Sequence, residues 1–209
     1  MVHKTSLKRN NRIRKKPPPF LGGFYLTFFV NLLRLGKTRT MKTMILAADL
    51  NWGIGSSRTE SGFPWPRIPE VLKNFKNETM KTPNLVMGAT TAATLGYKPL
   101  PGRTHHILSR KLITPPHPEM KIYSSVEDIM RAFRTKHCMI IGGAQTYSAL
   151  APYASHIILT KIHEVYKEAD CFFDSKILAE FKEDQTRAFT LRPKSEGLPL
   201  VTVHYYDRM

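Results

Sequence analysis

The sequence predicts an α/β fold with a mostly parallel β-sheet and helices on both of its faces. From residue 43 onward, short apolar runs of strand length alternate with helical patterns, which is typical of parallel sheets. Several of these runs end in glycine, as strands that turn directly into a helix often do. The chain has 209 residues, 42% of them hydrophobic, so it can bury the core of one such domain.

The first elements are a buried strand, a polar loop and an amphipathic helix. The compact apolar run at residues 43–50 predicts the strand, and a turn at 51–55 and a polar loop at 56–64 follow it. A helix is expected from Pro69 because proline is favoured in the first helical turn. The apolar positions that lie roughly on one face of this helix are Val71, Leu72, Phe75 and Met80.

The rest of the chain continues the alternation and ends in two antiparallel strands. Ser124 is the expected N-cap of one helix, with Glu127 completing a capping box. We expect strands at residues 85–88, 105–109, 121–123, 137–143 and 155–162, and helices at 90–95, at 124–135 and over about eight residues from Gln145. Residues 184–191 and 199–206 alternate in hydrophobicity and predict the terminal antiparallel pair.

Positive charge is concentrated at the N-terminus. The first 40 residues hold ten of the 32 basic residues and no acidic one, which leaves 22 basic and 16 acidic residues in 41–209. The net charge of +16 therefore predicts no nucleic-acid binding by the body of the protein. We divide the chain into an N-terminal extension, residues 1–40, and a folded domain, residues 41–209.

Three interpretations of the extension stay open. Residues 20–35 are apolar but shorter than a bilayer-spanning helix, so they suit a targeting or anchoring leader, and membrane contact is expected only in that case. The segment is alternatively a true, disordered extension. The third interpretation is a start codon assigned too early, with translation beginning at Met41 or Met44. We favour the third because a complete domain pattern begins directly after Met41.

Cysteine and histidine usage predicts neither disulfides nor a metal site. Cys138 and Cys171 each lie in an apolar run and have no metal-ligand spacing, so we expect buried free thiols and a cytoplasmic protein. His105 and His106 are the only adjacent pair, and neighbours in a strand point to opposite faces. We therefore expect no metal ion.

The ends of the predicted strands carry groups that suit a phosphorylated ligand. Glycine allows a backbone to approach an anion closely at Gly88 and at the Gly142-Gly143 pair, although each glycine also suits a simple turn. Thr90 or Thr91 could cap a helix or bond a phosphate. Ser109, Arg110 and Lys111 end a third strand with a hydroxyl and two cations, which suit a phosphate but taken alone are more typical of a solvated surface. The rigid PLPGR loop at residues 99–103 presents Arg103 in a geometry that suits a carboxylate.

These motifs together resemble the dihydrofolate reductase family over residues 43–206. The segments that carry the resemblance are AA at 47–48, WGIG at 52–55, FPW at 63–65, LKNFK at 72–76, VMG at 86–88 with Thr91, PLPGR at 99–103, ILSR at 107–110, IIGG at 140–143 with Tyr147, and LTKI at 159–162. Residues 1–40 have no counterpart in the family.

The resemblance implies one domain with a roughly eight-stranded sheet and the reduction of dihydrofolate by NADPH. Hydride would go to C6 and a proton to N5. Arg103 would bind the α-carboxylate of the glutamate tail, and Phe75 would pack on the p-aminobenzoyl ring. The implied substrate-binding residues are Ile45, Val71, Phe75, Leu95, Arg103, Tyr147 and Thr160.

The same resemblance implies a cofactor site along the strand ends. Ser109 and Arg110 would hold the adenosine 2′-phosphate, which favours NADPH over NADH, and the Gly142-Gly143 bond is expected to be cis. A mobile loop would cover the nicotinamide from Ile54 to Trp65. The implied cofactor-binding residues are Ala47, Ile54, Gly55, Gly88, Thr90, Thr91, Leu108, Ser109, Arg110, Ile141, Gly142, Gly143, Ala144, Gln145, Thr146 and Tyr147.

One position departs from the family pattern. The family places a carboxylate on the first helix. Counting back from Phe75 puts Val71 at that position. Counting forward from Trp65 by five residues, the spacing of short bacterial members, gives Glu70 instead. One residue turns a helical side chain by about 100°, so Glu70 reaches the pterin only if the first turn is irregular. Otherwise Glu70 is a solvent-facing acid favoured by the helix dipole. We assign catalysis to Glu70 and Trp65, with water as the alternative proton source.

We consider two functions and favour the first. The first is a working, monomeric, cytoplasmic dihydrofolate reductase of one-carbon metabolism. The second is a protein of the same fold that binds NADPH or folate with little turnover, as a structural or assembly component, which Val71 favours. A reductase of another pyrimidine or pterin, as in the related riboflavin-pathway domain, is disfavoured because the arginine of the PLPGR loop suits a glutamate tail.

Overall fold

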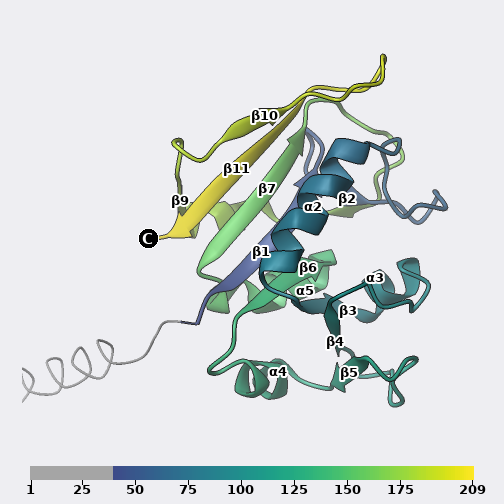
Figure 1. Ribbon diagram of the computed structural model, residues 1–209, viewed down its shortest axis with the longest axis vertical. Helices are drawn as coiled ribbons and strands as arrows, with labels where there is room; N and C mark the ends of the chain where they lie inside the picture. Colours follow the sequence, from purple (N-terminus) through teal and green to yellow (C-terminus); the bar gives the residue numbers. More distant parts are fainter. Residues whose placement is uncertain (1–39) are drawn as a thin grey trace, which may run out of the picture. The chain divides into compact units, whose positions relative to one another are not determined.

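The computed structural model describes residues 40–209, so the predictions for residues 1–39 lie outside the described part of the chain. Its centre is a nine-stranded sheet with the order β10-β11-β7-β1-β6-β3-β4-β5, in which β9 also pairs with β11 (Figure 1). The parallel strands are β1 (Lys42–Ala48), β3 (Asn84–Gly88), β4 (Thr104–Leu108), β5 (Met120–Tyr123), β6 (Cys138–Gly142) and β7 (His156–Ile162). The antiparallel strands are β9 (Phe181–Glu183), β10 (Phe189–Leu191) and β11 (Val201–Arg208).

Helices cover both faces of this sheet, as the sequence predicts. On one face, α4 (Val126–Ala132) and α5 (Ala144–Leu150) pack on side chains that include Met44 and Leu46 of β1. On the other face, α2 (Pro69–Lys81) and α3 (Ala89–Thr94) pack beside Ile45. Short 3-10 helices occur at η1 (Ala151–Tyr153) and η2 (Ser175–Glu180). No helix within residues 40–209 is long and apolar enough to cross a membrane.

The structure has one more strand in its main sheet than expected, and a second small sheet. Of the predicted strand at 184–191 only residues 189–191 are extended, as β10, and β9 precedes the predicted range at residues 181–183. Residues 53–55, predicted as part of a turn, form β2 (Gly53–Gly55), which pairs with β8 (Cys171–Phe172). Strands of two or three residues depend on a distant partner and leave no periodic pattern in the sequence.

The side chains that α2 buries are not the same as the apolar side chains of its sequence. Leu72 and Met80 are 38% and 47% exposed, whereas the buried residues of the helix are Val71, Asn74, Glu78 and Thr79. Phe75 is half-buried. The expectation that the apolar positions share one buried face is therefore wrong for Leu72 and Met80.

Two other local predictions need correction. Ser125, not Ser124, is the N-cap of α4, because its hydroxyl oxygen accepts the backbone N–H of Asp128 at 3.1 Å. Both cysteines are free, but only Cys138 is buried, and Cys171 on β8 is half-buried. Burial raises the pKa of the Cys138 thiol to about 12, so it stays protonated and unreactive at neutral pH.

Candidate active site

The central sheet opens between β1 and β6. The two strands pair only over residues 42–44 and 138–140, and the connections then leave in opposite directions, from β1 through α2 to β3 and from β6 through α5 to β7. Open α/β sheets bind ligands at such a point, beyond the carboxyl ends of the strands. The buried hydroxyl of Tyr147 on α5 bridges the opening by donating to the carbonyl of Ile45 at 2.7 Å. Burial raises the pKa of Tyr147, so this donor keeps its proton.

Two glycine corners meet beside this opening. The Gly142–Gly143 peptide bond is cis, and Gly142 has a φ of 118° that side chains rarely tolerate. A Cβ at Gly142 would lie 3.1 Å from Oη of Tyr147. At the end of β3, a Cβ at Gly88 would lie 2.7 Å from Oγ1 of Thr146, closer than real Cβ atoms come. At both corners there is therefore space for a glycine backbone but not for a side chain.

Neither helix that starts at these corners has a side-chain cap. Gly88 is the N-cap of α3 and Gly143 that of α5, and no side chain accepts a hydrogen bond there. The alternative that Thr90 or Thr91 caps α3 is therefore wrong. A Cβ at Gly143 would lie 3.4 Å from Oγ1 of Thr91, so this hydroxyl faces the second corner. Close backbone approach and free N–H groups fit the pyrophosphate of a dinucleotide.

Other residues expected at the cofactor line the same edge. Ala144, Gln145 and Thr146 form the first turn of α5, with Thr146 buried. Ile54 and Gly55 lie on β2, next to β8. Ala47 is paired with Thr160 across β1 and β7. Ile141, like Leu95, packs against the core cluster under α2 and α3.

The third corner follows β4. Oγ of Ser109 accepts the backbone N–H groups of Lys111 at 3.2 Å and Leu112 at 3.0 Å, which leaves the hydroxyl hydrogen available. Leu108 is partly buried beside the core under α4 and α5. Arg110 is exposed and forms no ion pair with any other residue of 40–209. This corner therefore presents a hydroxyl and an unpaired guanidinium.

Arg103 is a largely buried cation without a carboxylate partner. Its residue is 8% exposed, Nη1 donates to Oγ1 of Thr79 at 2.9 Å, and Nε donates to the carbonyl of Pro101 at 3.3 Å. Burial lowers the pKa of Arg103. No acidic side chain of residues 40–209 forms an ion pair with it. A guanidinium fixed in this way suits an incoming carboxylate.

Val71, Phe75 and Thr79 lie along one side of α2. They are four residues apart, so each is about 6 Å further along the helix than the one before it. Val71 lies at the first turn, Phe75 in the middle, and Thr79 contacts Arg103 near the last turn. An elongated ligand about 12 Å long, with an apolar group at one end and a carboxylate at the other, would match this row.

The residues around Val71 are neutral. Val71 packs in a cluster with Trp65, Ile68, Ile162 and Val201, and Ala47 packs against it. Thr160, the partner of Ala47, is buried. Glu70 lies on another side of α2, where Oε1 accepts the backbone N–H of Lys194 at 3.2 Å and Oε2 is buried without a partner. The role of Glu70 stays a prediction, and this contact favours water as the proton source.

Several buried polar residues that support the site carry no recognisable sequence signal. Nε2 of His105 accepts the backbone N–H of Leu100 at 3.0 Å and so fixes the PLPGR loop. The buried carboxylate of Asp49 accepts the backbone N–H groups of Asn51, Gly53 and Tyr166 at 2.7–3.0 Å. Asp49 thus joins the turn that precedes the predicted loop to the segment before β8. Only the distant partners reveal these roles.

The loop that is predicted to cover the nicotinamide, residues 54–65 (the cover loop), is also held in place at Ser57. The carboxylate of Asp170 accepts the backbone N–H of Ser57 at 3.0 Å and its hydroxyl at 2.5 Å. These hydrogen bonds from Ser57 lower the pKa of Asp170, so the carboxylate is charged at neutral pH. The loop therefore has a fixed anchor close to β8.

The Asp170→Ala variant should loosen the cover loop and lower the rate of turnover. Loss of the Ser57 anchor leaves the loop open more of the time, and we expect kcat to fall roughly tenfold. Single-turnover kinetics and limited proteolysis within residues 56–64 measure the two effects. Asp174→Ala is the matched control, because Asp174 caps η2 and does not contact Ser57. Equal rates and equal proteolysis in both variants would contradict the anchor.

Comparisons with known proteins agree with this geometry. The sequence model of the dihydrofolate reductase family matches residues 41–206. The chain is 29% identical over 166 residues to the dihydrofolate reductase of Neisseria gonorrhoeae, covering 79% of this chain and 98% of the relative. It is 32% identical over 131 residues to the dihydrofolate reductase of Bacillus subtilis (strain 168), and this match covers 61% of this chain and 72% of the relative.

A solved structure is similar over the same region. It is a dihydrofolate reductase from Enterococcus faecalis complexed with NADP(H) and RAB-propyl, which superposes with a TM-score of 0.69 at 28% identity and covers 81% of this chain and 97% of its own. This chain belongs to the dihydrofolate reductase family.

Proposed function

We propose that this chain catalyses the NADPH-dependent reduction of 7,8-dihydrofolate to 5,6,7,8-tetrahydrofolate. The observation that carries the proposal is the row along α2, which ends at the unpaired guanidinium of Arg103. Dihydrofolate has the same order of parts: a pterin, a p-aminobenzoyl ring and a glutamate with its α-carboxylate. The glycine corners next to this row, with their uncapped helix starts, would accommodate the pyrophosphate of a dinucleotide.

Each part of the site has a distinct task in this proposal. Bound NADPH supplies the hydride that goes to C6 of the substrate. Arg103 binds the α-carboxylate, and Phe75 packs on the p-aminobenzoyl ring, so both hold the pterin in place. Trp65 and Val71 form an apolar wall that excludes bulk water. Since the wall carries no acid, the proton on N5 comes in this proposal from a water molecule, which is then reprotonated from bulk solvent.

Turnover distinguishes this enzyme from a binding protein of the same fold. The full-length protein should oxidise NADPH in the presence of dihydrofolate between pH 5 and 8, followed by absorbance. Product identification by mass spectrometry should show tetrahydrofolate. Binding of NADPH and folate without oxidation at any pH in this range would instead favour the structural or assembly role.

The Arg110→Ala variant should lose the preference for NADPH over NADH. The free guanidinium of Arg110 can pair with the 2′-phosphate, so its removal should raise KM for NADPH about tenfold and leave KM for NADH unchanged. Steady-state kinetics with both cofactors measure the difference. Lys111→Ala, an exposed neighbour, is the matched control. A similar rise in KM for both cofactors would place the 2′-phosphate elsewhere.

We further propose that the protein works as a monomer in the cytoplasm. The two free thiols support a reducing compartment. Size-exclusion chromatography with light scattering tests the monomer, and fractionation of the source cells tests the compartment.

A further inference from the structure

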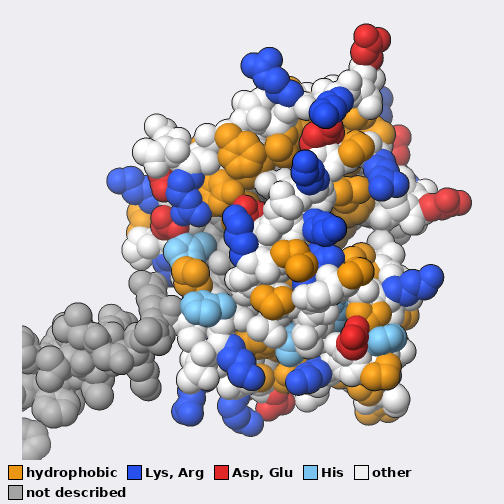
Figure 2. All heavy atoms as spheres, viewed as in Figure 1, with side chains coloured by type: hydrophobic (Ala, Val, Ile, Leu, Met, Phe, Trp, Pro, Cys, Tyr) orange, Lys and Arg blue, Asp and Glu red, His pale blue; other side chains and the backbone are white. Residues whose placement is uncertain are grey.

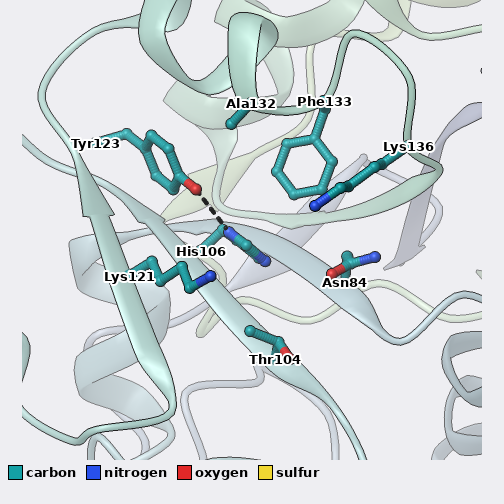
Figure 3. Close-up of a pocket in the computed structure, with 8 residues that line it drawn as sticks. All are labelled: Asn84, Thr104, His106, Lys121, Tyr123, Ala132, Phe133 and Lys136. Carbon is teal, nitrogen blue, oxygen red and sulfur yellow. Dashed lines mark hydrogen bonds between the residues drawn. The ribbon is translucent and has the colours of Figure 1, made fainter.

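A second hollow lies on the opposite side of the sheet from α2. It has a volume of about 330 Å³ and lies between α4 and the strands β4 and β5 (Figure 3). Its lining residues are Asn84, Thr104, His106, Lys121, Tyr123, Ala132, Phe133 and Lys136. None of them is among the residues assigned above to folate or NADPH, so this hollow is separate from the candidate active site.

His106 lies at the centre of the lining with an unused ring nitrogen. The residue is 5% exposed, its Nδ1 is 3.1 Å from Oη of Tyr123, and its ring meets the ring of Phe133 edge-on at 4.7 Å. Nε2 has no partner among residues 40–209 and exposes almost no surface, so a ligand in the hollow reaches it only when neighbouring side chains shift. Figure 3 shows Nε2 turned away from Tyr123, toward the side where Asn84 and Lys136 lie. A buried polar atom without a partner is costly and calls for a ligand or water.

The charge around this ring is positive. Lys121 on β5 and Lys136 before β6 line the hollow, both are exposed, and neither pairs with an acid within residues 40–209. Figure 2 shows Lys and Arg side chains along the lower edge of the domain, where α4 and β5 lie (Figure 2). Burial, together with Lys121, His105 and Lys136, lowers the pKa of His106 to about 4. The lining contains no carboxylate, so an anion would find only favourable charge.

We propose that this hollow binds a small organic phosphate, with its phosphoryl group between Lys121 and Lys136 and one oxygen accepting the N–H of His106. In the neutral ring, Tyr123 donates to Nδ1 and the hydrogen remains on Nε2, which makes Nε2 the donor. Two ammonium groups and one ring N–H suit a tetrahedral, doubly charged group, whereas a planar carboxylate is better matched by arginine. Tyr123 and Ala132 provide apolar surface for the organic part, whereas the Phe133 ring is almost fully buried, and the volume is at the lower end of small-molecule sites.

Phenyl phosphate is the probe for this site. We titrate it into the full-length protein, labelled at histidine and saturated with NADPH so that the cofactor corner is filled, and follow the ring signals by NMR. The His106 signals should shift and saturate. The ring, which titrates near pH 4 without ligand, should titrate at higher pH with phenyl phosphate bound because the anion stabilises its charged form. Benzoate should bind at least tenfold more weakly.

Surface variants keep the test independent of folding. Lys121→Ala with Lys136→Ala should weaken phenyl phosphate at least tenfold, whereas Lys176→Ala with Lys182→Ala, two exposed lysines on η2 and β9, should leave the affinity unchanged. Arg110→Ala should also leave it unchanged. The proposal is overturned if the His106 signals do not move, if both lysine pairs have the same effect, or if Arg110→Ala abolishes binding, since binding would then belong to the cofactor corner.

Discussion

The Val71→Asp variant is expected to reduce dihydrofolate at pH 7 roughly a hundredfold faster than the parent chain. A carboxylate at this position would be the one ionisable group among Trp65, Ile68, Ile162 and Val201. General acid–base assistance contributes about 10²–10⁴-fold to a rate, and burial would raise the pKa of the new carboxyl toward neutrality. Steady-state kinetics between pH 5 and 9 should show a higher kcat that falls as the pH rises.

Two controls distinguish the effect of the new carboxyl group from an effect of side-chain size and from a contribution of Glu70. Val71→Asn introduces a side chain of similar shape without an acid, and it should leave kcat unchanged or lower it. Glu70→Ala should change kcat less than twofold because Glu70 contacts the backbone of Lys194 on another side of α2. Loss of activity in Glu70→Ala would show that Glu70 supplies the proton and would overturn the role of water.

The Arg103→Met variant is expected to raise KM for dihydrofolate by roughly ten- to hundredfold while kcat changes little. A charge-assisted, two-point contact with a carboxylate stabilises binding by about 1.5–3 kcal/mol, which corresponds to this range of KM. The measurement compares dihydrofolate with a dihydropterin that lacks the p-aminobenzoylglutamate tail. The shorter molecule should show the same KM in the parent and in the variant.

Arg103 also has structural contacts that need their own control. Its bonds to Thr79 and to the carbonyl of Pro101 help to hold the PLPGR loop. Thr79→Val removes one of these bonds but keeps the guanidinium, so it should lower Tm by a few degrees and raise KM less than Arg103→Met does. An equal rise in KM for both substrates in Arg103→Met would show that the guanidinium does not contact the tail.

The sequence predicted the elements of the fold well because hydrophobic periodicity is a local property. Each parallel strand is found within about two residues of its expected position. The glycines expected at the ends of β3 and β6 lie at the carboxyl-terminal ends of these strands. The exceptions depend on contacts between distant residues. The pairing of β2 with β8 joins residues more than one hundred positions apart, and the cap of α4 is displaced by a single residue.

The candidate site was less accessible to prediction for the same reason. The exposure of Leu72 and Met80 could not be foreseen, since an apolar residue on a helix indicates a core face in most proteins. The two adjacent histidines illustrate the limit further. Alternation along β4 correctly separates them, with His105 bonded to the PLPGR loop and His106 to Tyr123, but it does not say which face holds a hollow.

The single rigid helix that carries Val71, Phe75 and Thr79 also has a consequence for selectivity. The helical rise fixes the separation of the three positions, and the bond from Arg103 to Thr79 ties the guanidinium to the last of them. If the row binds the substrate as proposed, α2 thereby sets the length of the molecule that the site accepts. A ligand whose spacer is one ring shorter or longer would satisfy one end of the helix and leave the other without a partner.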